Sequence, residues 1–300
     1  METVIETRGL SVRAPLKTIL DSVDLDVAKG SVTGLLGENG AGKTTTLRVL
    51  LGLMGRSKGT VRVLGMDPAR DEYAIKQRVG YVPDEHGYPS WMSIRRLVSF
   101  VGGFYDRFSH ESVLNDLVRL RLPLGQSIGS LSKGEAAKVA MTLALGHSPE
   151  LLLLDEPTSG LDPRVRQEML RLLVERSQTA GMTVLFSSHI LSDIAQIADR
   201  VAIMSRGNVV CSSSMEDFVT SLVRMSFVWE GDPPAGVAIP GCRRLTLRGR
   251  EVEAIVPGRL DPDGIARAIG AKSVRVEPLT LDELFVETVS ATPLSQPFLK

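Results

Sequence analysis

The sequence predicts an α/β protein with a largely parallel β-sheet, because short apolar segments of strand length alternate with helical segments over most of the chain. Two details support this fold class: a run of four leucines, typical of a strand buried on both faces, and a glycine-rich turn that leads from an apolar run into a helical stretch. The strands expected in this part of the chain are 4–12, 19–27, 31–36, 60–64, 80–82, 151–154, 183–186, 200–204 and 209–212.

The first elements follow from residue periodicity. Apolar and polar residues alternate over 4–12 and 19–27, which predicts two half-buried strands. Residues 31–36 are more continuously apolar and end at Gly37, and a helix is expected over 44–53.

The middle of the chain is expected to be helical. Between residues 91 and 122 apolar residues recur at helical spacing, and another helix is expected over about 133–145. Asp162 and Pro163 provide an N-cap followed by proline at the first helical position, so a further helix begins there, and Gly181 ends it.

The pattern continues with a short helix over 192–198 and a hairpin that turns at residues 206–208. It changes after Met215, where a stretch rich in proline and glycine (231–241) precedes short strands and two helices. The expected domains are 1–215, with a helical subdomain at about 85–148, and a smaller α+β domain over 216–290, followed by a poorly ordered tail over 291–300.

The composition excludes several classes of protein. With 43% hydrophobic and 23% charged residues, the 300-residue chain is neither disordered nor fibrous. Its 35 basic and 35 acidic residues balance, which argues against a general nucleic-acid binder. Two cysteines favour a reducing compartment, and neither a membrane span nor the apolar core of a signal peptide is visible, so a soluble cytoplasmic protein is expected.

Residues 37–44 fit G-x-x-x-x-G-K-[ST], the phosphate-binding loop, between a predicted strand and a predicted helix. Glycines let the backbone N–H groups turn toward phosphate oxygens, and the helix adds its positive end. Lys43 is expected at the β- and γ-phosphates and Thr44 at Mg²⁺; a chance glycine-rich turn is the competing interpretation. The expected nucleotide-binding residues here are Gly37, Glu38, Asn39, Gly40, Ala41, Gly42, Lys43, Thr44 and Thr45.

Two carboxylates follow the four-leucine strand at 151–154, at the sheet edge where the phosphate loop is expected. Asp155 is expected to hold Mg²⁺, through water, and Glu156 to act as the general base toward the attacking water. The alternative is a pair of carboxylates that only caps a strand at the surface.

Three further motifs carry a family resemblance. The segments Leu131-Ser132-Lys133-Gly134-Glu135, Ser159-Gly160-Leu161-Asp162 and Ser187-Ser188-His189 resemble the signature, the loop after the catalytic glutamate and the switch histidine of ATP-binding-cassette (ABC) ATPases. The resemblance covers about residues 4–214. It implies a P-loop NTPase cassette with a mostly parallel core sheet, an antiparallel β subdomain and a helical subdomain.

In that family two cassettes pack head to tail over two ATP molecules. The resemblance therefore implies that Ser132 and Gly134 of one subunit face the γ-phosphate held by a second subunit, in a homodimer or a heterodimer. A capping box between Ser132 and Glu135 explains the same residues by helix initiation alone. His189 is expected to donate a hydrogen bond to the γ-phosphate, as a catalytic switch.

The sequence departs from the family pattern at three positions. Ala14 stands where an aromatic residue usually stacks on adenine, so Arg13 is the candidate for stacking. Asp84 replaces a glutamine and becomes a candidate metal ligand, as a charge rather than an amide. Lys133 replaces the first signature glycine and either adds charge near phosphate or points to solvent.

Residues 277–285 resemble the C-terminal helix of cassette subunits from drug, antibiotic and peptide exporters. The leading hypothesis is thus an ATPase subunit of a bacterial exporter, bound at the inner face of the membrane to a separately encoded permease. The permease contact is expected near residues 86–97, with Tyr88, Trp91 and Met92 exposed; a core role for these residues is the alternative. Competing functions are a soluble ABC ATPase of translation or DNA repair, which the single set of motifs disfavours, and a weakly hydrolysing regulatory module.

Overall fold

The computed structural model describes residues 2–231, 239 and 241–290. The chain divides into two compact units, Met1–Ser212 and Ser213–Lys300. The tail expected to be poorly ordered (291–300) and most of the stretch rich in proline and glycine (232–238 and 240) lie outside the described residues.

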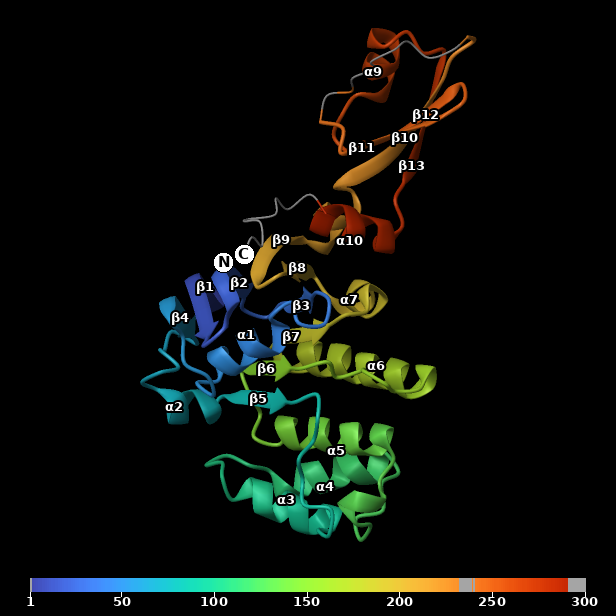
Figure 1. The fold of residues 1–300 in the computed structure, drawn as a ribbon. Helices are drawn as coiled ribbons and strands as arrows, with labels where there is room; N and C mark the ends of the chain where they lie inside the picture. Colours follow the sequence, from blue (N-terminus) through green and yellow to red (C-terminus); the bar gives the residue numbers. More distant parts are fainter. Residues whose placement is uncertain (1, 232–238, 240, 291–300) are drawn as a thin grey trace. The chain divides into compact units, whose positions relative to one another are not determined.

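The described residues of the first unit form a six-stranded sheet with the order β5-β6-β7-β3-β8-β9, in which all neighbours from β5 to β8 are parallel (Figure 1). Its strands are β3 (Val32–Leu36), β5 (Val79–Val82), β6 (Leu151–Leu154), β7 (Thr183–Ser188), β8 (Arg200–Ser205) and β9 (Asn208–Ser214). Every residue of β3, β6 and β7 is buried, as expected for strands covered on both faces. The predicted α/β fold class is therefore confirmed.

A second sheet of this unit is antiparallel and has the order β2-β1-β4. Its strands are β1 (Thr3–Ala14), β2 (Lys17–Ala28) and β4 (Lys58–Val63). The first two are longer than predicted because their pairing continues until Ala14 lies opposite Lys17. One apolar core joins this sheet to helix α1 (Lys43–Leu50), β3 and β6, and thereby holds the loop between β3 and α1 in place.

Local capping signals explain helix α6 (Pro163–Ala180). The Asp162 side chain accepts hydrogen bonds from the backbone N–H groups of Arg164 and Val165, each at 3.1 Å, and Gly181 ends the helix at φ 58°. The remaining helices near the core sheet are α7 (Leu191–Ile197) and α2 (Glu72–Lys76). Helix α2 was not predicted, and α1 ends at Leu50 rather than at residue 53.

The helical subdomain contains α3 (Ile94–Gly102), α4 (His110–Arg119), a 3₁₀ turn (Ile128–Ser130) and α5 (Lys133–Leu145), all drawn in green in Figure 1. The helical pattern over 91–122 is thus two helices, because the Ser93 and Ser109 side chains each cap a separate helix start. These helices share a core cluster of their own.

The expected exposed cluster around Met92 needs correction. Met92 is only 7% exposed and belongs to the core of the helical subdomain, and Tyr88 packs partly against that core. Trp91 is 72% exposed, as expected. Neighbouring residues point in different directions because the segment enters α3, so only part of the apolar cluster faces solvent.

His147 is a buried titratable group in the first unit and follows α5. Its ring is 3% exposed and stacks on Tyr105 with the ring centroids 4.0 Å apart. Burial, opposed by a weaker backbone interaction with Val79, lowers the pKa of His147 to about 4. The unfolded chain therefore binds this proton first as the pH falls, so stability is lost as the pH falls from about 6.5 toward 4.

Acidification from pH 7.5 to 5 is expected to cost the native protein about 2 kcal/mol of unfolding free energy through His147 alone. Urea unfolding at both pH values measures the loss. A His147→Phe variant keeps an aromatic ring but cannot titrate, so its loss should be smaller by that amount. Equal losses in the native protein and the variant would contradict the assignment.

The second unit contains a four-stranded antiparallel sheet with the order β11-β12-β10-β13 within its described residues. Its elements are α8 (Met215–Val219), β10 (Leu222–Val228), β11 (Arg244–Arg248), β12 (Glu251–Pro257), α9 (Pro262–Ala268), β13 (Ser273–Pro278) and α10 (Leu281–Ser290). The short strands after 241 match the prediction, whereas β10, the strand that pairs with both β12 and β13, was missed. An apolar core of its own supports this unit.

Candidate nucleotide-binding site

The loop between β3 and α1 is shaped by glycine. Gly42 lies in the left-handed region at φ 112°, and a Cβ there would lie 2.5 Å from Leu20 Cδ2. A Cβ on Gly37 would lie 2.5 Å from the Met204 carbonyl oxygen. These contacts with β2 and β8 leave no room for side chains at either position, so the motif residues 37–44 form one compact turn at the start of α1.

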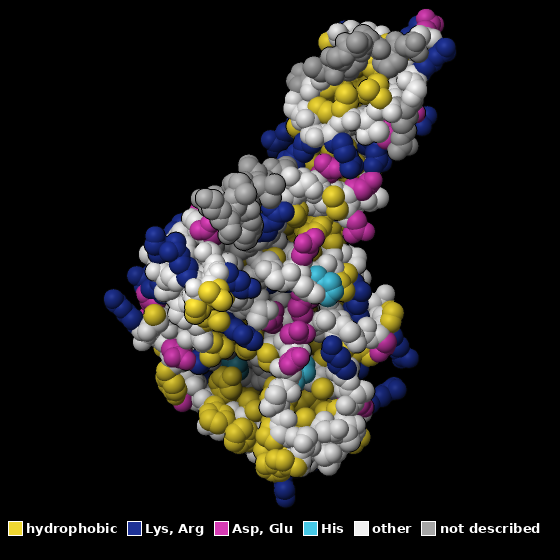
Figure 2. All heavy atoms as spheres, viewed as in Figure 1, with side chains coloured by type: hydrophobic (Ala, Val, Ile, Leu, Met, Phe, Trp, Pro, Cys, Tyr) yellow, Lys and Arg dark blue, Asp and Glu magenta, His cyan; other side chains and the backbone are white. Residues whose placement is uncertain are grey.

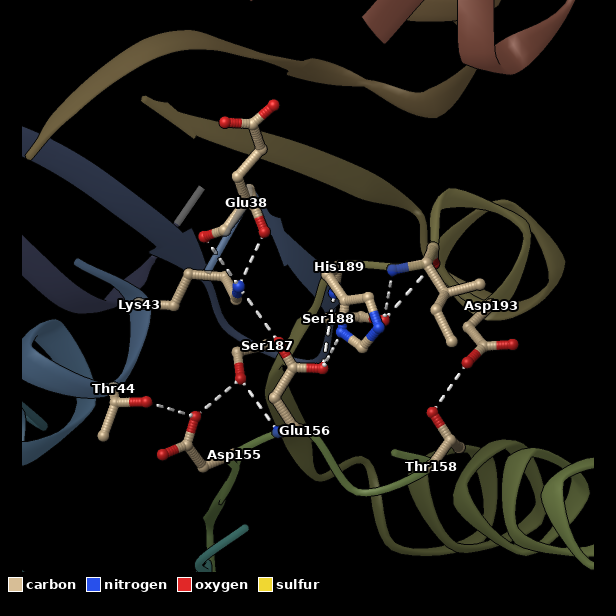
Figure 3. A network of polar contacts seen from close by, with 12 residues as sticks. Glu38, Lys43, Thr44, Asp155, Glu156, Thr158, Ser187, Ser188, His189 and Asp193 are labelled. Atoms are coloured by element: carbon tan, nitrogen blue, oxygen red, sulfur yellow. Dashed lines mark hydrogen bonds and ion pairs between the residues drawn. The ribbon is translucent and has the colours of Figure 1, made fainter. Parts of the chain in front are cut away.

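Lys43 points back into this turn. Its Nζ donates to the carbonyl oxygens of Gly37 at 2.6 Å and Glu38 at 3.3 Å, and forms an ion pair with Glu156 Oε1 at 3.0 Å (Figure 3). The lysine side chain is 6% exposed and that of Glu156 is 10% exposed. The structure therefore brings the loop lysine and the second carboxylate after β6 into direct contact.

Asp155 and Thr44 also meet, although they are distant in sequence. Thr44 Oγ1 donates to Asp155 Oδ1 at 3.0 Å, and Ser187 Oγ donates to the same oxygen at 2.8 Å (Figure 3). Burial raises the pKa of Asp155, while these two hydrogen bonds oppose the increase. A hydroxyl and a carboxylate thus converge beside the phosphate loop.

Ser187 was not among the predicted site residues. Besides its bond to Asp155, its Oγ accepts a hydrogen bond from the Glu156 backbone N–H at 2.9 Å. Two consecutive hydroxyl residues, Ser187 and Ser188, directly after the apolar residues 184–186 of β7 were the available signal.

Glu156 lies in the left-handed region at φ 49°, which is unfavourable for a residue with a Cβ. Its Oε2 accepts hydrogen bonds from His189 Nδ1 at 2.8 Å and from the His189 backbone N–H at 3.3 Å. Because a carboxylate only accepts, His189 Nδ1 carries the proton in this contact. Lys43 and His189 therefore hold the carboxylate from two sides (Figure 3).

The other predicted site residues differ in how exposed they are. In the loop, Glu38, Asn39 and Gly40 are exposed and Ala41 is buried, and Thr45 follows on α1. Asp84 is exposed after β5, and its charge contributes to the raised pKa of Asp155. On the viewed face of this unit, Figure 2 shows acidic and histidine side chains gathered in a central column.

Arg13 is exposed near the end of β1. The pairing of β1 with β2 shifts in register between Val12 and Arg13, and the Arg13 backbone N–H donates to Ser57 Oγ at 3.0 Å. The stacking role of Arg13 stays a prediction.

The signature segment starts α5 as a capping box. Ser132 Oγ accepts from the Glu135 N–H at 3.3 Å, and Glu135 Oε2 accepts from the Ser132 N–H at 2.8 Å. Gly134 lies against α6, where a Cβ would be 2.9 Å from Val165 Cγ1. Among the described residues, no polar contact joins Ser132 or Gly134 to the phosphate loop of this chain.

A glycine-rich turn after β3, a buried lysine and two carboxylates after β6, which is separated from β3 only by β7, define a protein that binds nucleoside triphosphates. The comparisons with known proteins agree. The ABC transporter family matches residues 20–159. The chain is 34% identical over 213 residues to the bacitracin transport ATP-binding protein BcrA of Bacillus licheniformis, covering 70% of this chain and 69% of that protein.

A relative of similar length includes the second unit. This is the ABC transporter ATP-binding protein YhaQ of Bacillus subtilis, 32% identical over 295 residues, covering 91% of this chain and 94% of that protein. Among solved structures, an ATP binding subunit of an ABC transporter superposes with a TM-score of 0.65 and 26% identity, covering 72% of this chain and 92% of that chain.

The protein belongs to the ABC transporter ATP-binding family. It accordingly binds ATP and hydrolyses it in a reaction coupled to transport. In the part of the chain that the structure describes, no helix has the length and apolar character needed to span a bilayer.

Proposed function

We propose that this chain is the energy-coupling subunit of a bacterial exporter, with residues 1–215 as the ATPase domain and 216–290 as an accessory domain. The network that joins Lys43, Glu156 and His189 carries the proposal, since it supplies a phosphate-binding cation, a base and an orienting group in one place. Similarity to a bacitracin transport protein supports a role in export. In this proposal the chain lies at the inner face of the membrane, bound to a transmembrane permease that is a separate polypeptide.

In the reaction that we propose, the N–H groups of the loop and Lys43 hold the β- and γ-phosphates. Glu156 takes a proton from water as the water oxygen bonds to the γ-phosphorus, and the bond from that phosphorus to the β,γ-bridging oxygen breaks to leave ADP and phosphate. His189 orients the Glu156 carboxylate through Nδ1. When this hydrogen bond rearranges, His189 donates to the γ-phosphate instead.

The residues near Asp155 fit a magnesium ion. Oxygen ligands suit Mg²⁺, which takes one or two carboxylates together with substrate phosphates and waters rather than a full protein cage. Thr44 Oγ1 and Asp155 Oδ1 lie 3.0 Å apart. The described residues contain no group of three or more acidic, histidine or cysteine side chains that could hold a metal ion by themselves. We assign Thr44 and Asp155, with Asp84 as a further candidate, as the residues that hold the ion, whose charge offsets that of the phosphates.

A second ATPase subunit completes the site in this proposal. The capping box at the start of α5 leaves the N–H groups of Lys133 and Gly134 outside the helical hydrogen bonds, as in any first helical turn. With Ser132, they form a donor-rich edge suited to the γ-phosphate bound by the opposite subunit. This arrangement can form in a homodimer or in a heterodimer.

The permease surface is proposed on the helical subdomain. Trp91 is exposed, and so are Phe100 and Phe104 of the same subdomain, which are 53% and 62% exposed and pack edge to face with centroids 5.2 Å apart. Apolar side chains gather over this lower part of the unit in Figure 2. Large aromatic residues that stay exposed are typical of protein interfaces, so this surface fits an apolar helix of the permease.

Co-purification from membranes tests the transporter assignment. A tagged native chain should recover a membrane protein, and a Trp91→Ala/Phe104→Ala variant should recover it at least about fivefold less, since exposed aromatic anchors dominate such interfaces. ATP hydrolysis by the purified variant should stay near the native rate. A Tyr73→Ala variant, which removes an exposed aromatic residue from α2, serves as a comparison. Unchanged recovery in the double variant would reject this surface, and recovery of ribosomes or DNA-repair proteins instead would reject the exporter role.

A further inference from the structure

The pairing of β6 with β7 stops short of the reacting groups. The last paired residues of the two strands are Leu154 and Phe186. Glu156 and His189 follow on the segments beyond the pairing. Ser187 joins these segments before the reacting groups, because its Oγ accepts a hydrogen bond from the Glu156 backbone N–H at 2.9 Å. Beyond Glu156 and His189, contacts other than strand pairing have to hold the two segments together.

Asp193 makes such a contact. It lies in α7, four residues after His189, and Thr158 lies two residues after Glu156. Thr158 Oγ1 donates to Asp193 Oδ2 at 2.6 Å, and both residues are buried (Figure 3). This hydrogen bond and the one between His189 and Glu156 thus join the same two segments of the chain.

Arg166 holds the other carboxylate oxygen of Asp193. Its Nε donates to Asp193 Oδ1, and its Nη2 donates to Ser192 Oγ at 3.0 Å. The Asp193 side chain is only 2% exposed, so the guanidinium supplies the opposite charge that a buried carboxylate needs. Arg166 lies in the first turn of α6, where its backbone N–H donates to the carbonyl oxygen of Asp162. With both oxygens bound, the Asp193 carboxylate ties α7 to the start of α6.

We propose that Asp193 is a positioning residue for ATP hydrolysis. By binding Thr158 and Arg166, it holds the segment after β7 against the segment after β6. Glu156 and His189 lie on these segments, so they stay in hydrogen-bonding contact, and the carboxylate keeps one orientation toward the attacking water. This inference rests on the proposed function, in which Glu156 is the base and His189 orients it.

Steady-state ATP hydrolysis by the full chain is the first test. Asp193→Ala would leave Arg166 without its carboxylate and endanger folding, so Thr158→Val, which keeps the shape and removes only the hydroxyl, is the main variant. Its kcat should fall about tenfold because the base is less well placed, and its KM for ATP should change less than about twofold because the phosphate loop is untouched. Asp193→Asn, which loses the charge that faces Arg166, should lower kcat likewise. Thr158→Ser retains a hydroxyl and should retain the native kcat.

Nitrogen NMR of the nucleotide-free chain, labelled at its four histidines, tests whether the effect passes through His189. In the native structure Nδ1 of this ring carries the proton, because the Glu156 carboxylate only accepts. The hydrogen bond of the ring decides which nitrogen is protonated. At pH 8.5, where an ordinary imidazole is neutral, the share of His189 protonated on Nδ1 should therefore fall to about half or less in Thr158→Val. The spectrum of His189→Gln identifies the resonances of this ring.

Thr142→Val is the matched control, because this threonine is also buried and its hydroxyl donates to the Lys138 carbonyl oxygen of its own helix at 2.8 Å. It should leave kcat and the His189 resonances at native values. Native values of kcat or of these resonances in Thr158→Val would overturn the positioning role, whatever the change in melting temperature. Native hydrolysis by His189→Gln would instead overturn the role of His189 in the proposed function, so the two failures are distinguishable.

Discussion

Replacement of Lys43 by alanine is expected to lower ATP hydrolysis by at least about a hundredfold and to weaken ATP binding strongly. The substitution removes a cation that is 6% exposed, donates to two carbonyl oxygens of the loop and forms an ion pair with Glu156. It also leaves the Glu156 carboxylate without a cation in a poorly hydrated position, which disfavours the approach of a further anion. Both effects weaken binding of the γ-phosphate.

Phosphate release at saturating ATP and titration with ATP measure these losses. Lys58→Ala removes an exposed lysine of β4 and should leave both quantities at native values. Thermal unfolding of each variant separates a folding defect from a site defect. Hydrolysis by the folded Lys43→Ala protein within tenfold of the native rate would show that this lysine is not the phosphate ligand.

Replacement of Glu156 by glutamine is expected to reduce hydrolysis by roughly a hundredfold to ten-thousandfold, the range that a positioned general base contributes. The amide keeps the shape of the side chain and can still accept from His189, but it cannot take a proton from water. ATP binding should persist, in contrast to Lys43→Ala. The full chain should therefore accumulate as an ATP-bound dimer.

Single-turnover hydrolysis and size-exclusion chromatography with and without ATP measure the rate and the dimer. Glu150→Gln provides the control, since Glu150 directly precedes β6, at the end opposite Glu156, and forms an ion pair with Arg78. A Glu156→Gln protein that hydrolyses ATP at more than a tenth of the native rate would assign the base elsewhere. A native chain without hydrolysis above background would favour the regulatory-module hypothesis.

Several features could be predicted because they depend on neighbours in the chain. The motif at 37–44 lies on a single turn, and the run Leu151–Leu154 is long enough to make one buried strand. The limits of α6 could be predicted, because the capping residues Asp162, Pro163 and Gly181 affect only the backbone within a few residues of themselves. Local features of this kind can be predicted without knowing the rest of the fold.

Other features depend on packing between distant segments. The helical pattern does not show that Met92 is buried and Trp91 exposed, since that depends on where the other helices of the subdomain lie. Strand β10 was missed because its place between β12 and β13 comes from pairing with residues far along the chain.

The sequence by itself determined the fold class and the phosphate-loop motif, and it predicted Glu156 as a base and His189 as its neighbour in the site, because each of these depends on a short local pattern. Only the tertiary structure decided that Glu156 lies between Lys43 and His189 and that Ser187 connects it to Asp155. The order β6-β7-β3 brings three strand ends together from distant parts of the chain. Hydrogen bonds and ion pairs act over about 3 Å, so their partners are known only once long-range strand pairing has placed them.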